Sequence, residues 1–172
     1  MPLKLRPCVG ELRTMRLKSI SRLVFSLLLC LGVGILGSLV TAPQIPTWYA
    51  GLVKPFWTPP PFVFPIAWSV LYLLMAISFW RVWDLETRST ARTKAIMWFL
   101  VQLALNALWS PVFFGWHGTK TALLIILALL LAIAATMLMA IRTDRLAAWL
   151  LAPYLAWVAY ATTINAGVVA LN

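Results

Sequence analysis

Long apolar runs separated by short polar segments divide the chain into five predicted membrane-spanning helices. The predicted spans cover about residues 23–42, 62–83, 95–115, 119–141 and 146–170. The shortest of the five apolar runs, Leu23–Val40, contains no charged residue or histidine and would rise about 27 Å as an α-helix, close to the roughly 30 Å hydrocarbon core of a bilayer. Apolar and polar residues do not alternate in these runs, as they would in the strands of a membrane barrel. We therefore predict an all-α membrane protein, a bundle of five transmembrane helices.

The composition is that of a chain embedded in lipid over most of its length. Hydrophobic residues make up 63% and charged residues 10%, and the mean hydropathy is +0.92. Soluble domains are nearer to half apolar and a quarter charged. We assign residues 23–172 to one domain and residues 1–22 to a basic tail. The net charge of +10 lies on the tail and short loops without a nucleic-acid motif, so nucleic acid is not an expected partner.

The basic residues are divided unequally between the two sides of the predicted bundle. The N-terminal tail, the second loop and the fourth loop carry 12 Lys and Arg residues, whereas the opposite side carries Lys54 and Lys120. The positive-inside rule then places the N-terminus in the cytoplasm and the C-terminus outside. Three alternatives concern the first residues: a signal peptide cleaved after Ala42, a mitochondrial address, or a start at Met15.

The segment between the first two spans combines proline with aromatic residues. Seven of the eleven prolines lie between Pro43 and Pro65, interleaved with aromatic residues that include Trp48 and Trp57. Proline fixes φ and lacks an amide donor, so the segment should be stiff, unlike a Gly/Ser-rich tether. Two interpretations are open: a Pro/Trp-rich lid loop across one end of the bundle, or an aromatic belt at the membrane surface.

Helical periodicity gathers aromatic and amide side chains on one face of three predicted spans. The faces consist of Trp68, Tyr72, Met75 and Phe79; of Gln102, Asn106, Trp109 and Phe113; and of Tyr154, Trp157, Ala161 and Asn165. Amides that face lipid are costly, so we expect these faces to point inward. Helix packing alone would account for each face. Three such faces and a stiff aromatic loop together predict a pocket for a flat, largely apolar molecule with a few polar groups.

Small residues and prolines mark two further features of the predicted helices. Cys30, Gly34 and Ser38 recur every four residues, which suits either the close approach of another helix or contact with lipid. Pro111 and Pro153 should interrupt the regular hydrogen bonding of their helices.

Conventional catalytic and metal-binding groups are missing from the predicted spans. The one histidine, His117, lies in a short loop without a second metal ligand nearby, and we expect it to be solvated. The four acidic residues all lie on the predicted cytoplasmic side, which leaves no intramembrane carboxylate for proton transfer. Hydrolase, ATPase and ion-pump functions are therefore disfavoured, and no metal or cofactor is required.

Three blocks of sequence resemble the TspO/MBR family of tryptophan-rich sensory proteins and translocator proteins. The first block, residues 48–72, contains WYAGLVKPFWTPP and FPIAW. The others are QLALNALWSPVFFG at residues 102–115 and PYLAWVAYATTIN at residues 153–165. The resemblance covers about residues 24–172.

The resemblance implies a five-helix bundle, often a homodimer, whose first loop closes over a ligand pocket between the helices. It implies porphyrin or haem precursors as ligands, and cholesterol or benzodiazepine-type compounds in animal relatives. The candidate ligand-binding residues, from the family positions and the shared faces, are Trp48, Trp57, Trp68, Tyr72, Asn106, Trp109, Trp157 and Ala161. Trp68 and Trp157 match the tryptophans implicated in light-dependent porphyrin breakdown by some bacterial members, and are the candidate catalytic residues.

From the resemblance we expect a membrane receptor or sensor that binds tetrapyrroles and transports them or regulates their level. A porphyrin-degrading enzyme and a translocator of hydrophobic ligands are the alternatives. The animal cholesterol motif is not expected, because no basic residue follows Tyr160. We expect the bacterial inner membrane, with an outer or mitochondrial membrane as the alternatives.

Overall fold

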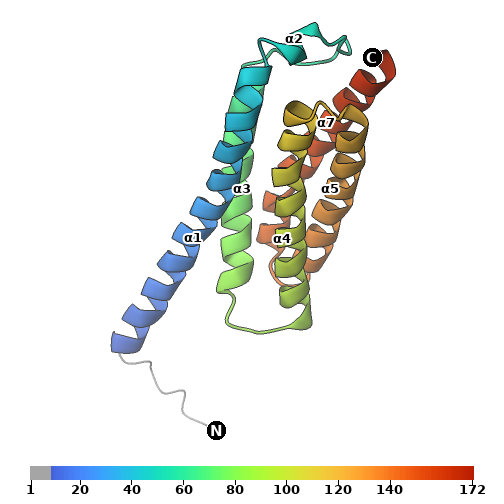
Figure 1. Ribbon diagram of the computed structural model, residues 1–172. Helices are drawn as coiled ribbons and strands as arrows, with labels where there is room; N and C mark the ends of the chain where they lie inside the picture. Colours follow the sequence, from blue (N-terminus) through green and yellow to red (C-terminus); the bar gives the residue numbers. More distant parts are fainter. Residues whose placement is uncertain (1–8) are drawn as a thin grey trace.

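The computed structural model describes residues 9–172, with side chains from Met15 onward, as a bundle of helices (Figure 1). The long helices are α1 (Val9–Thr41), α3 (Val63–Asp84), α4 (Thr90–Ser110), α5 (Thr119–Ala140) and α7 (Ala152–Leu171). The short ones are η1 (Ala42–Gln44), α2 (Trp48–Gly51), η2 (Pro111–Gly115) and α6 (Arg145–Leu150). In this described part of the chain, five segments are long and apolar enough to cross a membrane. The prediction of an all-α, five-span membrane protein is confirmed.

One helix boundary differs from the prediction, and the predicted interruption near Pro153 is confirmed. Helix α1 begins at Val9, so part of the predicted basic tail continues the first span as helix. The fifth span is not one helix but two, because α6 ends at Leu150 and α7 begins at Ala152. Pro153 lies in the first turn of α7, where a missing amide donor costs no intrahelical bond.

The other predicted interruption, at Pro111, is a change of helix type. Residues Pro111–Gly115 form a π-helical turn at the end of α4, and the amide of Trp116 donates to the Pro111 carbonyl at 2.9 Å. Such turns are rare in proteins, and many of those that occur lie at functional sites. The turn directs Phe113 and Phe114 into a buried cluster at this end of the bundle.

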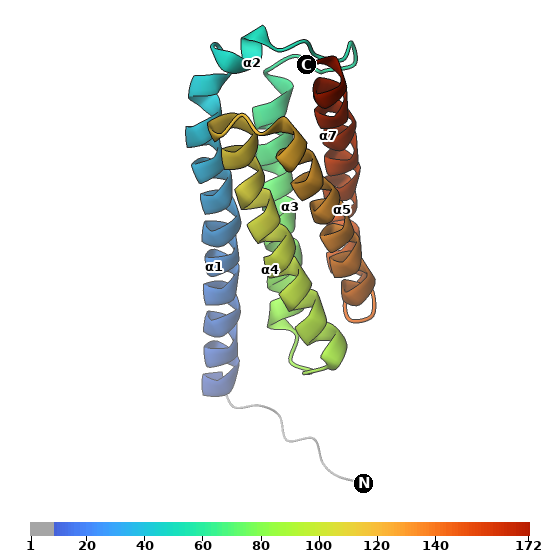
Figure 2. The same cartoon turned by 45° about the vertical axis from the view of Figure 1, so that its right-hand side comes forward.

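The helices pair side by side in the two views of Figures 1 and 2, with α1 along α3, α4 along α5, and α5 along α7. At Gly34 of α1, an added Cβ would lie 2.7 Å from the ring of Tyr72, so α3 approaches α1 closely there. Cys30 is fully buried, whereas Ser38 is exposed. Of the two interpretations of these small residues, the close approach of another helix therefore holds for Cys30 and Gly34 but not for Ser38.

Ionic contacts join the helices at the end of the bundle that carries the N-terminus of α1. In the part of the chain whose side chains are described, two ion pairs occur: Arg22 with Asp84 at 3.0 Å, and Arg81 with Asp144 at 2.8 Å. Asp144 also accepts from the amide of Ala147 at 3.0 Å and so caps α6. These contacts fasten α3 to α1 on one side and to α6 on the other.

Candidate functional site

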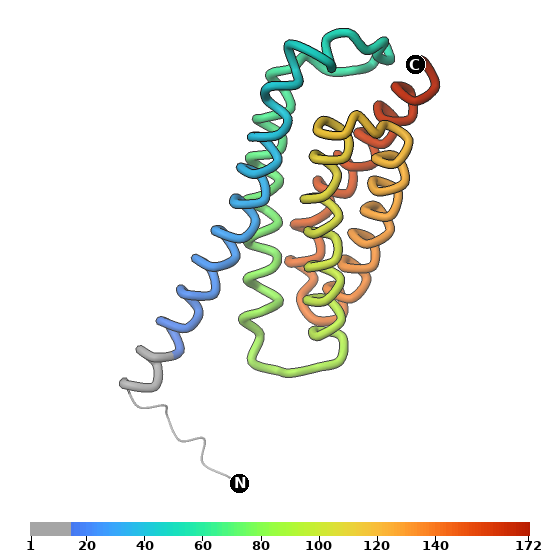
Figure 3. Tube along the Cα trace, in the orientation of Figure 1, coloured from blue at the N-terminus to red at the C-terminus, as the bar shows by residue number. Residues whose placement is uncertain are grey.

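The segment between α1 and α3 crosses the opposite end of the bundle and reaches the C-terminus before it turns back into α3 (Figure 3). Its first part packs on the connection between α4 and α5. The Trp48 indole stacks on the His117 imidazole with centroids 4.2 Å apart, and it meets Phe113 edge-on at 5.5 Å. His117 Nε2 also lies 3.2 Å from Gln44 Oε1. His117 is exposed, as expected of a solvated residue, but it holds two side chains of this segment.

The second part of the crossing segment docks on α7. Asn172 Oδ1 accepts from the Val53 amide at 3.1 Å, and Asn172 Nδ2 donates to the Val53 carbonyl at 2.9 Å. At Gly167, a Cβ would overlap the ring of Pro55, so this position allows the segment to lie directly on the helix. The segment is thus held at both edges of the bundle.

Lys54 stabilises the bend in the middle of the segment. Its ammonium donates to the carbonyls of Tyr49 and Leu52, both at 2.8 Å, and lies 4.8 Å from the centroid of the Tyr49 ring. Burial raises the pKa of the Tyr49 phenol above its ordinary value, so this side chain is neutral at physiological pH. A cation that satisfies the carbonyls at the end of the short helix α2 explains why a lysine lies among prolines here.

Beneath the segment, a hydrogen-bonded chain of three side chains links three helices. The Tyr72 hydroxyl of α3 donates to Asn106 Oδ1 of α4 at 2.6 Å. Asn106 Nδ2 donates to the Tyr154 hydroxyl of α7 at 3.1 Å. All three side chains are buried. This arrangement satisfies the amide, which would otherwise be costly at membrane depth.

Helices α3 and α7 face each other through two aromatic pairs. Phe64 meets Trp157 edge-on at 5.9 Å, and Trp68 meets Tyr154 edge-on at 6.2 Å. Trp68 also stacks on Tyr72 at 5.5 Å. The indole nitrogen of Trp157 is buried and has no acceptor among the described residues. The wall between these helices is therefore apolar and aromatic, with one unused hydrogen-bond donor among the described residues.

Closer to the crossing segment, Trp109 of α4 connects the aromatic residues beneath that segment to α7. Its ring stacks on Phe113 at 4.9 Å, and its nitrogen donates to Asn165 Oδ1 at 3.3 Å. Asn165 Nδ2 in turn donates to the carbonyl of Thr119 at 3.0 Å. Asn165 thereby joins α7 to both α4 and the start of α5.

Trp57 lies at the seam between the crossing segment and α7. The residue is 42% exposed, and its main-chain carbonyl accepts from the Tyr160 hydroxyl at 2.5 Å. Tyr160 packs against Trp157 at 5.9 Å, and Ala161 follows Trp157 by one helical turn. The hydroxyl of the next residue, Thr58, is buried without a partner in the described chain.

The structure groups the candidate residues into three layers rather than one. Trp68, Tyr72, Asn106, Trp157 and Ala161 lie in or beside the central cluster and its hydrogen-bonded chain, Trp48 and Trp109 lie against Phe113, and Trp57 lies at the seam. Tyr154, Tyr160 and His117 complete these layers but were not among the candidates. The shared face of the last span indicates Tyr154. No sequence signal pairs His117 with Trp48, because 69 residues separate them along the chain.

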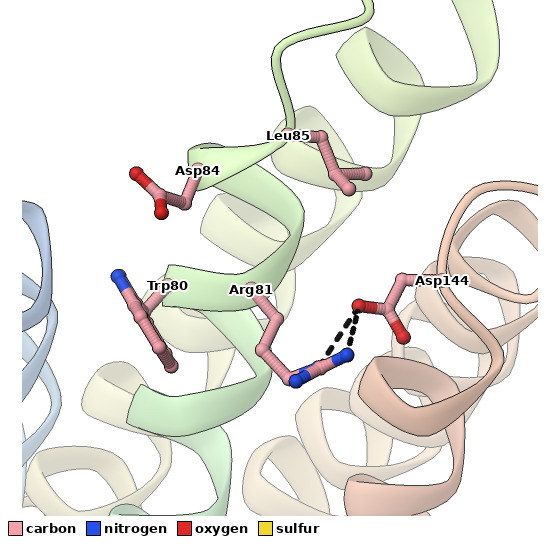
Figure 4. A pocket seen from close by; sticks show the side chains of 5 residues that line it. All are labelled: Trp80, Arg81, Asp84, Leu85 and Asp144. Atoms are coloured by element: carbon pink, nitrogen blue, oxygen red, sulfur yellow. Dashed lines mark hydrogen bonds and ion pairs between the residues drawn. The ribbon is translucent and has the colours of Figure 1, made fainter. Parts of the chain in front are cut away.

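A cavity of about 160 Å³ lies at the other end of the bundle, lined by Trp80, Arg81, Asp84, Leu85 and Asp144. Figure 4 shows Arg81 and Asp144 facing each other at its edge. The oxygens of both carboxylates already accept hydrogen bonds from protein groups: Ser19 and Arg22 for Asp84, and Arg81 and Ala147 for Asp144. The cavity is also smaller than the roughly 300 Å³ at which small-molecule sites begin. These groups serve to hold the helices together.

Comparison with known proteins gives a consistent result. Residues 26–171 match the TspO/MBR family. The chain is 40% identical over 154 residues to the tryptophan-rich protein TspO of Archaeoglobus fulgidus, covering 90% of this chain and 99% of that protein. It is 42% identical over 125 residues to the tryptophan-rich sensory protein of Cereibacter sphaeroides, covering 73% and 77%. It is 41% identical over 119 residues to the human translocator protein, covering 69% and 70%.

Proposed function

This chain belongs to the TspO/MBR family, and from that premise we propose that it is a membrane receptor for a tetrapyrrole, bound between its helices beneath the segment that joins α1 to α3. The names of its relatives, sensory and translocator proteins, support a receptor or sensor role in the membrane. The tetrapyrrole, a flat and largely apolar molecule, is the specific part of the proposal.

The observation that carries the proposal is the aromatic wall between α3 and α7 with its unused donor. Trp68 and Trp157 are partly buried aromatic rings on which a planar ligand ring could stack, and aromatic stacking contributes about 0.5–1.5 kcal/mol per pair beyond burial. The buried Trp157 nitrogen has no acceptor in the described protein, and an unmade buried hydrogen bond costs about 1–3 kcal/mol. A ligand acceptor at this nitrogen would recover that cost.

The segment across the end of the bundle suits a lid for such a site. It is held by His117 at one edge and by Asn172 at the other. The hydrogen bonds at the Asn172 edge are exposed, so this edge can separate without unfolding the helices, whereas at the other edge Trp48 also packs against the buried Phe113. Ligand entry would then require release of one edge.

The test is a dark titration of the purified protein with protoporphyrin, read by tryptophan fluorescence quenching. Saturable binding is expected, and Trp157→Phe should weaken it by about tenfold because the ring remains while the donor is lost. Trp149→Phe is the matched control, since Trp149 lies on α6 with 66% of its surface exposed. Absence of saturable binding to the wild-type protein would overturn the proposal.

A porphyrin-degrading enzyme is the second candidate, favoured by Trp68 and Trp157 on facing helices. An indole can be oxidised by a photoexcited porphyrin, which gives these two rings a chemical role beyond stacking. Product spectra under illumination, in the presence of dioxygen, test this function. The double variant Trp68→Phe, Trp157→Phe should abolish new products, and an unchanged product yield would exclude both residues from the reaction.

A translocator is the remaining candidate, supported by the name of the human relative. Uptake of protoporphyrin into sealed liposomes, with and without an ion gradient, distinguishes transport from binding. Uptake without a gradient is expected if the protein is a carrier, because its charge-free stretches contain no carboxylate to couple ion movement.

A further inference from the structure

Among the residues whose side chains are described, Gln102 is the one buried amide that makes no hydrogen bond. It lies in the middle of α4, its side chain is fully buried, and neither its oxygen nor its nitrogen has a partner among the described residues. An amide without partners in an apolar environment costs about 2–7 kcal/mol. A group from outside the chain that bonds this amide would remove much of that cost.

The neighbours of Gln102 along α4 determine from which side such a group can come. Three residues earlier, Phe99 stacks face to face on Phe79 of α3, with centroids 4.5 Å apart and an angle of 16° between the rings. This stack closes the interior with hydrocarbon toward the end that carries the ion pairs. One turn later, Asn106 lies in the hydrogen-bonded chain with Tyr72 and Tyr154. Hydrocarbon thus blocks Gln102 from one end of the bundle, and from the crossing segment a ligand group would have to pass the chain of Tyr72, Asn106 and Tyr154.

The facing part of α3 is small or flexible at this depth. Between Tyr72 and Phe79, the buried residues are Met75, Ala76 and Ser78, and the Ser78 hydroxyl already donates to the Ala147 carbonyl at 2.7 Å. Methionine adapts its shape readily, and alanine presents only a methyl group. A ligand group that passes Tyr72 toward the ion-paired end of the bundle would meet side chains that can change conformation. Gln102 lies on the opposite helix.

We propose that Gln102 is the innermost polar residue of the ligand site. Its side-chain amide hydrogen-bonds a ligand group that carries both a donor and an acceptor, either a neutral carboxyl or a primary carboxamide. A side-chain amide and such a group complement each other through two parallel hydrogen bonds. The apolar runs of the five spans contain no Lys, Arg or His that could pair with a carboxylate. A carboxyl group would therefore enter the site in its protonated form. This inference rests on the proposed function and specifies its ligand: a planar ring that bears a carboxyl or carboxamide side chain.

The experiment compares protoporphyrin with its dimethyl ester, which has the same ring but no carboxyl donor. Both are titrated in the dark against the full-length protein in detergent at about pH 4.5, close to the ordinary pKa of a carboxyl group, so that protonation adds little to the cost of binding the acid. The wild-type protein should bind the acid more tightly than the ester by about tenfold, which corresponds to about 1.4 kcal/mol. In Gln102→Met, which keeps the length of the side chain, this ratio should fall to about one while ester binding is retained.

Two further variants make the outcome specific. Gln102→Leu repeats the removal of the amide with a different shape, and Thr136→Val is the matched control. Thr136 is also buried at membrane depth, but its hydroxyl already donates to Ala132 of its own helix at 2.7 Å. Thr136→Val should keep the wild-type ratio of acid to ester.

Thermal unfolding without ligand supplies a readout that is independent of porphyrin. Removing an unsatisfied amide should raise the Tm of Gln102→Met above that of the wild-type protein. A lower Tm with an unchanged acid-to-ester ratio would show that Gln102 binds a permanent water molecule, and would overturn the inference while leaving the proposed function intact. If the wild-type protein binds neither acid nor ester, the proposed function fails and this inference fails with it.

Discussion

Tyr72 and Asn106 join α3 to α4 through a buried hydrogen bond of 2.6 Å from the Tyr72 hydroxyl to Asn106 Oδ1. The same tyrosine ring lies against Gly34 of α1 and stacks on Trp68. One side chain therefore contacts the first helix, the amide network and the aromatic wall. Changes in the position of α1 can reach the candidate site through this ring.

Tyr72→Phe tests the contribution of this hydroxyl to stability. The ring remains, but Asn106 Oδ1 loses its donor inside the bundle. We expect the free energy of unfolding to fall by about 1 kcal/mol, in the range for hydrogen bonds between membrane helices. Denaturation in mixed micelles measures it. Ser69→Ala is the control, because the exposed Ser69 hydroxyl donates only to its own helix; an equal loss in both variants would contradict the role of the bond.

Gly167→Ala should displace the crossing segment from α7. The added methyl group would overlap Pro55, and the hydrogen bonds between Val53 and Asn172 should weaken with the displacement. Hydrogen exchange at the Val53 amide should become faster. Gly32→Ala is the matched control in another helix, since an added Cβ there meets no atom within 4 Å. Unchanged exchange in Gly167→Ala would mean that the segment does not rest on α7 in solution.

Substitutions at His117 separate two of its roles, stacking and backbone conformation. His117 has a φ of 55°, in the left-handed region, where a non-glycine residue costs about 1–2 kcal/mol. Both His117→Gly and His117→Ala remove the stack on Trp48, so hydrogen exchange over residues 44–52 should rise in both. Only His117→Ala retains the backbone cost, and its Tm should be the lower of the two. Equal Tm values would contradict this assignment.

Asp144→Ala should destabilise the end of the bundle opposite the crossing segment. It removes both the ion pair with Arg81 and the cap of α6. The expected loss is about 1–3 kcal/mol, because the carboxylate is largely buried and a lost helix cap alone costs about 1 kcal/mol. Glu86→Ala, at an exposed position, should change stability by less than about 0.5 kcal/mol. Porphyrin binding should be retained in both variants, since the proposed site lies toward the other end of the bundle.

The sequence by itself determined the number and type of spans and which faces point inward. Uninterrupted apolar runs leave a chain in lipid few options other than helices, and the amides at positions 102, 106 and 165 had to be buried. It also located the breaks at Pro111 and Pro153, because proline lacks an amide donor. These are local consequences of residue chemistry.

The tertiary structure alone decided which side chains on those faces meet. That Asn106 is satisfied while Gln102 is not depends on where Tyr72 and Tyr154 reach across from other helices. The stack of His117 on Trp48 likewise depends on how the π-helical turn orients the α4–α5 connection. Helical periodicity fixes the direction of a side chain around its own axis, but its partner depends on the depth and rotation of the neighbouring helix. Those are set by the packing of the whole bundle.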